Sequence, residues 1–161
     1  MNDFAPLDDL LTGLADRLDG DARKRLGRTV AEDLRTTNAK RIKANVTPDG
    51  EAMVPRKAKP AGKLTDNADR KTSKSARAAA MFRRAATPRY LRKESSAGDA
   101  QVGFAGAMAR IMRVHHYGLR DTVIRDPKAP EVTYPERPVI GLTTDDRLRI
   151  LDRVLHGTHE R

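Results

Sequence analysis

The residues best placed to do chemistry are two adjacent histidines followed by a tyrosine and a glycine, His115-His116-Tyr117-Gly118. Imidazole groups can bind a metal ion or act as general bases near neutral pH. A metal site needs three or four ligands at defined spacing, and adjacent helical residues point about 100° apart, so this pair cannot readily share one ion. The chain has four histidines and no cysteine. We therefore expect no metal site, with His115 half-buried and bonded to a carbonyl group, and His116 exposed or at a subunit contact.

Paired carboxylates, another common source of acid–base chemistry, occur at Asp8/Asp9 and at Asp145/Asp146. Both pairs fall where helices are expected to begin, and a helix N-terminus favours acidic residues without any catalytic role. The sequence contains no Gly-x-Ser-x-Gly nucleophile elbow and no glycine-rich phosphate loop. It therefore predicts no enzyme and no cofactor, and catalysis by His115 or His116 stays open as an alternative.

The element that must position the histidines is a helix expected over about residues 107–117, ended by Gly118. Apolar side chains recur in it at helical spacing and predict one buried stripe. The residues of this stripe are Met108, Ile111, Met112 and His115.

The rest of the chain predicts further helices around this one. A leucine-rich helix over residues 4–19 and a basic helix over 22–43, capped by Asp21 and ended by Pro48, should form an antiparallel pair. We also expect helices over residues 77–90 and 144–155. The last helix should be capped by Thr143 and should pack through Leu148, Leu151 and Leu155, with Ile150 and Val154 beside them.

Short extended segments are expected between these helices. Residues 51–55 predict one short extended piece, Val102 and Phe104 alternate within a strand over 100–105, and a short edge strand is expected between prolines over 130–134. Residues 139–142 are apolar and should be buried.

Positive charge is concentrated in the middle of the chain. The net charge is +10 overall, with −4 over residues 1–20, +13 over 21–95 and +1 over 96–161. Residues 56–77 contain Leu64 as their only large apolar side chain, so this segment should be a flexible basic loop that orders only against a partner. Candidate contacts to a polyanion are Arg56, Lys57, Lys59, Lys63, Arg70, Lys71 and Lys74.

This charge leaves open a non-specific DNA-binding protein. No aromatic residue is interleaved with the basic loop to stack on bases, and no helix-turn-helix or zinc-finger pattern is present. Any DNA contact would therefore be made to phosphates and would weaken with salt.

Composition limits the size of the core and the cellular setting. Aromatic residues make up 4% of the chain, so the core should be small and oligomerisation would bury more surface. No apolar run approaches the ~18 residues that a membrane span needs, and the first residues do not form a signal peptide. We expect a soluble cytoplasmic protein of one domain. Its parts should be a helical pair (1–46), a turn with the basic loop (47–77), an α+β core (78–157) and a short tail (158–161).

The chain resembles the phage virion morphogenesis family, the tail-completion proteins of contractile-tailed phages and prophages. The resemblance is carried by the order of the expected elements and by two motifs. They are Arg-x-His-x-Tyr-Gly-Leu at residues 113–119 and Arg-Pro-x-x-Gly-x-Thr at residues 137–143. The resemblance extends over about residues 1–157. The residues expected in family packing or subunit contacts are Arg110, His115, His116, Tyr117, Gly118, Arg120, Arg137, Pro138 and Gly141.

The resemblance implies a structural, non-enzymatic virion protein that completes the tail at its head-proximal end and allows the tail to join the head. It also implies an α+β fold like that of small head–tail connector proteins, which work as rings. A small antiparallel sheet would then form from residues 100–105, 130–134 and 138–142. The implied partners are further copies of the chain, the tail terminator or tube, and neck or head-completion proteins. The implied location is the virion tail or neck, after assembly in the host cytoplasm.

Overall fold

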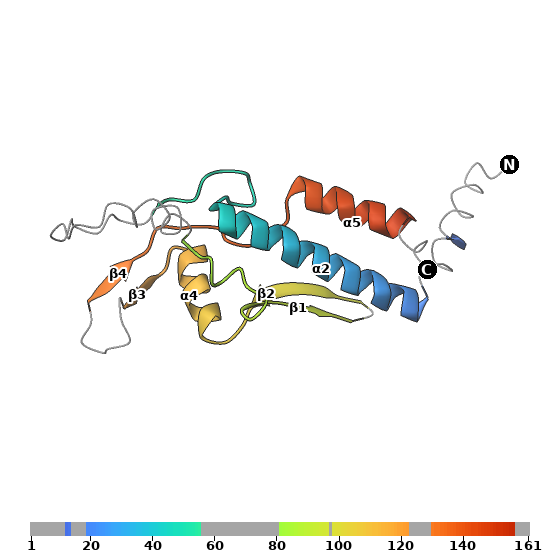
Figure 1. The fold of residues 1–161 in the computed structure, drawn as a ribbon, viewed down its shortest axis with the longest axis horizontal. Helices are drawn as coiled ribbons and strands as arrows, with labels where there is room; N and C mark the ends of the chain where they lie inside the picture. Colours follow the sequence, from blue (N-terminus) through green and yellow to red (C-terminus); the bar gives the residue numbers. More distant parts are fainter. Residues whose placement is uncertain (1–11, 14–18, 56–80, 97, 123–129, 157–161) are drawn as a thin grey trace, which may run out of the picture. The chain divides into compact units, whose positions relative to one another are not determined.

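The computed structural model describes residues 12–13, 19–55, 81–96, 98–122 and 130–156. Within them the chain is α+β, as predicted, with three helices and two small antiparallel sheets (Figure 1). Contacts divide the chain into two compact units. Unit 1 comprises residues 1–37, 92–102 and 142–161, and unit 2 comprises 38–91 and 103–141.

The elements follow one another in a simple order. The helices are α2 (Gly20–Ala44), α4 (Ala107–His116) and α5 (Thr144–His156). Strands β1 (Leu91–Ser95) and β2 (Ala100–Phe104) form one sheet, and β3 (Arg120–Thr122) and β4 (Glu131–Thr133) form the other. The predicted helices over 22–43, 107–117 and 144–155 and the strands over 100–105 and 130–134 are confirmed within a few residues. Strands β1 and β3 were not predicted.

Helix α2 begins two residues earlier than expected, because Asp19 and not Asp21 caps it. The Asp19 carboxylate accepts a hydrogen bond from the Ala22 amide at 2.6 Å, which lowers the pKa of Asp19. The helix ends where Asn45 takes the left-handed conformation, with φ of 56°, ahead of the turn that contains Pro48. Asn45 is a residue type that tolerates this conformation.

In unit 1, the β1–β2 hairpin approaches α2 at a glycine. A Cβ atom on Gly27 would lie 2.9 Å from the Ser96 carbonyl oxygen, so only glycine allows this approach. One turn further along α2, Glu32 pairs with Arg35 and, at 2.6 Å, with Lys93 of β1. These two cations lower the pKa of Glu32 to about 2.

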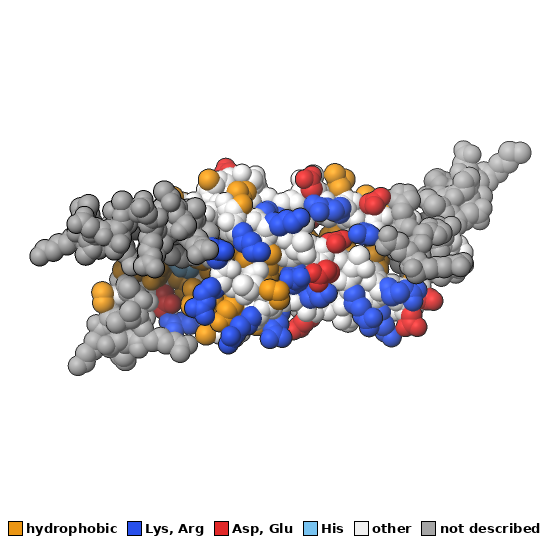
Figure 2. Space-filling model, in the orientation of Figure 1, with side chains coloured by type: hydrophobic (Ala, Val, Ile, Leu, Met, Phe, Trp, Pro, Cys, Tyr) orange, Lys and Arg blue, Asp and Glu red, His pale blue; other side chains and the backbone are white. Residues whose placement is uncertain are grey.

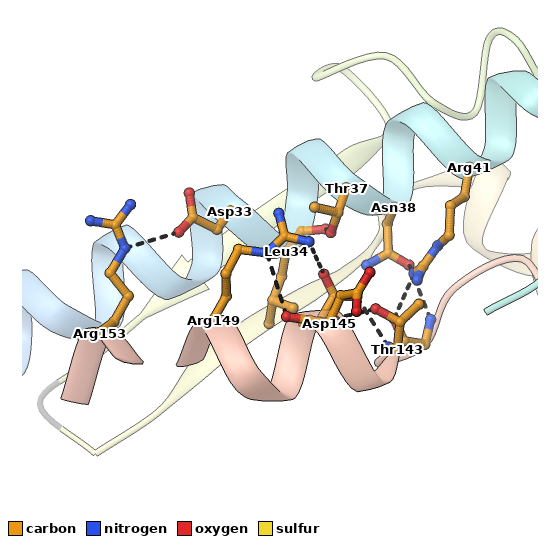
Figure 3. A network of polar contacts seen from close by, with 11 residues as sticks. Asp33, Leu34, Thr37, Asn38, Arg41, Thr143, Asp145, Arg149 and Arg153 are labelled. Carbon is orange, nitrogen blue, oxygen red and sulfur yellow. Dashed lines mark hydrogen bonds and ion pairs between the residues drawn. The ribbon is translucent and has the colours of Figure 1, made fainter. Parts of the chain in front are cut away.

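Helix α5 starts at the predicted cap, Thr143, which forms reciprocal bonds with Asp146. The Asp146 amide donates to the Thr143 hydroxyl at 3.0 Å, and the Thr143 amide donates to the Asp146 carboxylate at 3.1 Å. Further along, Arg153 lies 3.4 Å from Asp33 of α2 (Figure 3). Val30 and Leu34 of α2 line a small crevice together with α5 residues of this same face.

The predicted packing face of α5 is wrong. Asp146 is buried and Ile150 is half-buried, whereas Leu148, Leu151 and Leu155 are 60%, 53% and 45% exposed. The helix packs through the face that carries Asp146 and Ile150, and its leucines point away from that face. Figure 2 shows hydrophobic side chains among the Lys and Arg side chains on the drawn surface.

Unit 2 has a small core built on α4. The predicted stripe of α4 is only partly correct, because Met112 is buried while Ile111 is 47% exposed and Val114, off the stripe, is buried instead. Apolar side chains from well-separated segments of the unit complete the core. They include Ile42, Met53, Met81, Phe82, Leu91 and Val139.

The helix predicted over residues 77–90 is not present in its described part, residues 81–90, which forms consecutive turns. Thr87 and Tyr90 donate main-chain bonds to residues three positions back, and the Thr87 hydroxyl bonds to the Arg84 carbonyl at 2.7 Å. Pro88 has no amide hydrogen, and its ring would clash with that same carbonyl in an α-helix. Alanine content suggested a helix that the proline prevents.

The third strand predicted over residues 138–142 is also wrong. Pro138 has no amide hydrogen, and two of the next three main-chain amides bind side chains in place of a neighbouring strand. The Val139 amide donates to His116 Nδ1 at 3.2 Å, and the Gly141 amide donates to Asn38 Oδ1 at 3.0 Å. The segment over 51–55 contributes one isolated bridge, between Ala52 and Val46.

Two predicted features lie outside the described residues. They are the pairing of the leucine-rich helix over 4–19 with α2, and the flexible basic loop over 56–77.

We expect Gly118→Ala to destabilise the protein by about 1–3 kcal/mol. Gly118 has φ of 61°, and a Cβ atom there would lie 3.0 Å from the Glu136 amide nitrogen. Urea unfolding followed by circular dichroism measures the change. Gly103→Ala is the control, because its Cβ atom would meet nothing within 4 Å. Equal unfolding midpoints for the two variants would contradict this account.

Candidate functional site

Arg137 is buried in unit 2 and joins three segments of it. Its side chain, 4% exposed, donates to the carbonyl oxygens of Val54 at 2.6 Å, Pro55 at 3.1 Å and Pro135 at 3.5 Å. Its main-chain amide donates to the His115 carbonyl at 2.8 Å. A buried guanidinium requires several acceptors, and main-chain carbonyls supply them here.

His115 faces this guanidinium. Its Nδ1 atom lies 3.1 Å from Arg137 Nη1, and because the guanidinium can only donate, Nδ1 accepts the bond. The ring also packs against Phe82 and Tyr134, with centroids 5.0 and 4.9 Å away. His115 is half-buried, as expected, and the Arg137 guanidinium is a partner of its Nδ1 atom.

His116 turns to the other side of α4 and holds the segment after Pro138. It accepts the Val139 amide through Nδ1 and contacts the Tyr117 ring edge-on at 4.5 Å. Burial lowers the pKa of His116 below its ordinary value of 6.5, while Glu136 acts in the opposite direction. The two adjacent histidines therefore have separate main-chain and side-chain partners.

Gly141 is clamped by residues about 100 positions earlier in the chain. Its amide donates to Asn38 Oδ1, and its carbonyl accepts a bond of 2.7 Å from Arg41 Nη2. A Cβ atom on Gly141 would lie 2.7 Å from Pro48 Cγ, so this close approach requires glycine. Pro138, which is half-buried, lies in the sequence between Arg137 and Gly141.

Arg110 and Arg120 lie at the surface and form ion pairs around the β3–β4 sheet. Arg110 pairs with Asp121, and Arg120 lies 2.8 Å from Glu131. Both arginine side chains are more than half exposed, so these pairs contribute little to stability and leave the cations accessible to a partner.

An open groove of about 490 Å³ runs along α4, and we call it the α4 groove. Apolar side chains form most of its lining, and Arg113 and His116 supply polar groups. At its rim Tyr117 is 61% exposed. The residues that line it are Phe104, Ala109, Met112, Arg113, His116, Tyr117 and Ile140.

The structure thus brings Arg137, His115, His116, Pro138 and Gly141 into one part of unit 2. Sequence reasoning missed the α4 groove, because Phe104 and Ile140 meet α4 only in the folded chain. It also missed Asn38 and Arg41, whose helix carries many similar polar residues. The candidate polyanion contacts all lie between residues 56 and 74, outside the described residues.

Nothing in the described part of the chain gathers three or more potential metal-ligating side chains in one place. Nor does that part contain a helix with the length and hydrophobicity to cross a membrane.

Comparison with known proteins identifies the family. The sequence profile of the phage virion morphogenesis family matches residues 2–157. The chain belongs to the phage virion morphogenesis family. It is also similar to the protein named Tail completion protein S of Escherichia phage P2, with 32% identity over 162 aligned residues that cover all of both chains. No solved structure matches it.

Membership in the phage virion morphogenesis family confirms the resemblance that the two motifs indicated. It also confirms that the chain is a virion assembly protein and not an enzyme. The geometry agrees with that role, because the residues of the histidine motif contact Arg137, Val139 and each other. In this family member the motif acts through packing.

We expect Arg137→Ala to destabilise the protein by about 2–4 kcal/mol, because three carbonyl groups and His115 Nδ1 would lose a buried donor. Chemical unfolding in urea measures the effect. Arg84→Ala is a matched control, since this arginine side chain is exposed. A change below about 1 kcal/mol for Arg137→Ala would show that the guanidinium does not hold the unit together.

His116 should make stability fall as the solution becomes acidic. The unfolded chain takes up a proton near pH 6.5, whereas folded His116 stays neutral to lower pH, so stability present above 6.5 is lost as pH falls toward the folded pKa. His116→Asn keeps an acceptor for the Val139 amide and removes the titration. Melting temperatures at about pH 7.5 and about pH 5.5 should differ less for this variant than for the wild type. Equal differences would exclude His116 as a source of the pH dependence.

Proposed function

We propose that this chain completes the phage tail at its head-proximal end and enables the tail to join the head. The observation that carries this proposal is the full-length similarity to Tail completion protein S of Escherichia phage P2. On this proposal the chain is a component of the virion tail or neck. Its contacts are the tail terminator or tube on one side and neck or head-completion proteins on the other.

We further propose that the protein acts as a homo-oligomeric ring, in the manner of small head–tail connector proteins. Two features support this. The core of each unit is small, and several large apolar side chains remain exposed, among them Ile111, Tyr117, Leu148 and Leu151. Contacts between copies would bury them.

A contact with DNA is compatible with this role. Exposed basic residues line α2, and the basic stretch beyond residue 55 adds further charge. Such a contact would be made to phosphates, so it would weaken steeply with salt and carry no base specificity.

Lysates of a phage that lacks only this chain should accumulate filled heads and separate tails. Purified protein added to such a lysate should restore infectious particles, because the missing step is the joining of two finished structures. Electron microscopy of the added protein, carrying a gold label, should place it at the head-proximal tip of the tail. Gly103→Ala protein, whose added methyl group meets nothing, serves as the matched positive control. Joined particles in the lysate without added protein would refute the proposal.

A further inference from the structure

Three exposed arginines share the solvent side of the turn segment that leads into β1. Along residues 81–90, buried pairs alternate with exposed pairs, so one side of the segment faces the core of unit 2 and the other faces solvent. Ala85 and Ala86, 1% and 2% exposed, lie on the core side. The exposed residues are Arg83, Arg84, Pro88 and Arg89. We call the three arginines the arginine face.

The main chain beneath the arginine face is held at both ends. The Met81 amide donates to Asn45 Oδ1 at 3.0 Å, and the Tyr90 carbonyl accepts a bond of 2.8 Å from the Ala105 amide. The Arg89 guanidinium lies over the Tyr90 ring, 5.5 Å from its centroid. The arginines therefore project from a fixed support, and a ligand that binds them need not order the segment first.

The positive charge of the arginine face is not neutralised by the part of the chain that the structure describes. Residues 81–91 contain no Asp or Glu. None of the three arginines forms an ion pair with a described residue, whereas Arg110 and Arg120 of the same unit both do. The turn after α2 carries Asp49 and Glu51, near the end of the segment that begins at Met81. Like charges this close repel one another, so the face attracts an anion.

The composition of the arginine face favours a phosphate backbone over an acidic protein surface. A stable protein contact is centred on large apolar side chains, and none is exposed in residues 81–91. Phosphate contacts need only charge and hydrogen-bond donors, which the guanidinium fork supplies. Tyr90 is half-buried beneath Arg89, so the segment offers no free aromatic ring to stack on a base.

We propose that the arginine face binds the phosphate backbone of double-stranded DNA without reading its sequence. The inference rests on the proposed function, which brings the chain to the junction between the tail and a filled head. It assigns the DNA contact to three residues that lie outside both α2 and the basic stretch over 56–77.

Fluorescence anisotropy of a labelled duplex, titrated with the full chain over a series of salt concentrations, measures the contact. Each phosphate contact contributes about 0.9 to the slope of log affinity against log salt concentration. Arg83→Gln, Arg84→Gln and Arg89→Gln combined in one protein should therefore reduce this slope by about 2–3 and weaken binding at ~0.1 M salt by about tenfold or more. Glutamine removes the charge and keeps a polar side chain.

A matched control removes three positive charges that are not clustered. It combines Arg92→Gln, Arg113→Gln and Arg147→Gln, which lie on β1, α4 and α5, are exposed, and form no ion pair with a described residue. The net charge falls equally in both triple variants, so only a local contact separates them. The control should keep a slope close to that of the wild type. Circular dichroism spectra that match the wild type confirm that both variants are folded.

Poly-glutamate in place of the duplex tests the other class of partner, an acidic protein surface. We expect it to bind more weakly than the duplex at equal salt. Poly-glutamate binding as tight as that of DNA would overturn phosphate recognition. Equal slopes for the two triple variants would overturn the assignment to the arginine face, because the contact would then depend on net charge or on other basic residues.

The lysate assay separates this inference from the proposed function. Wild-type protein that restores infectious particles, yet binds DNA no better than the arginine-face variant, would overturn the contact and leave the tail role intact. DNA binding that depends on the arginine face, by protein that fails to restore joining, would support the contact and refute the tail role.

Discussion

The bonds between the Arg137 guanidinium and main-chain carbonyl groups hold unit 2 together. In most α+β proteins a sheet satisfies the main-chain groups of neighbouring segments, but here the chain is rich in proline where a sheet would be needed. Pro55, Pro135 and Val54 instead offer their carbonyl oxygens to one side chain with five donors. His115 of α4 completes the arrangement, so a helix and two irregular segments share one buried cation.

The same principle extends along the segment that follows. His116 accepts the Val139 amide, and Asn38 and Arg41 bind the two main-chain groups of Gly141. Side chains from two helices therefore do what a third strand would have done. Polar contacts therefore occupy part of the interior of unit 2 beside its apolar core, and apolar side chains such as Ile111 and Tyr117 lie at the surface.

This explains which features the sequence could predict. Helical periodicity and the Thr143 cap locate α2, α4 and α5, since those signals are local. Residues 138–142 were mistaken for a strand because their hydrogen-bonding partners lie up to 103 residues away. For α5, the sequence predicted packing through the leucines with Ile150 and Val154 beside them, because helical periodicity does not show which of these apolar residues face the core. Asp146, which is buried and bonded to Thr143, lies on the side of Ile150.

A protein that works by assembly is constrained differently from an enzyme. The histidine motif contains residue types suited to catalysis, yet in this chain their partners are Arg137, Val139 and neighbouring rings. Its role is to fix the path of the chain around α4. The close approach of Glu136 and the positive φ angle favour glycine at position 118. The motif therefore reports the fold that family members share. Which proteins a member contacts must be set by the surfaces that this frame presents, since its buried bonds are not available to a partner. In this chain two such surfaces are the α4 groove and the exposed leucines of α5, one on each unit.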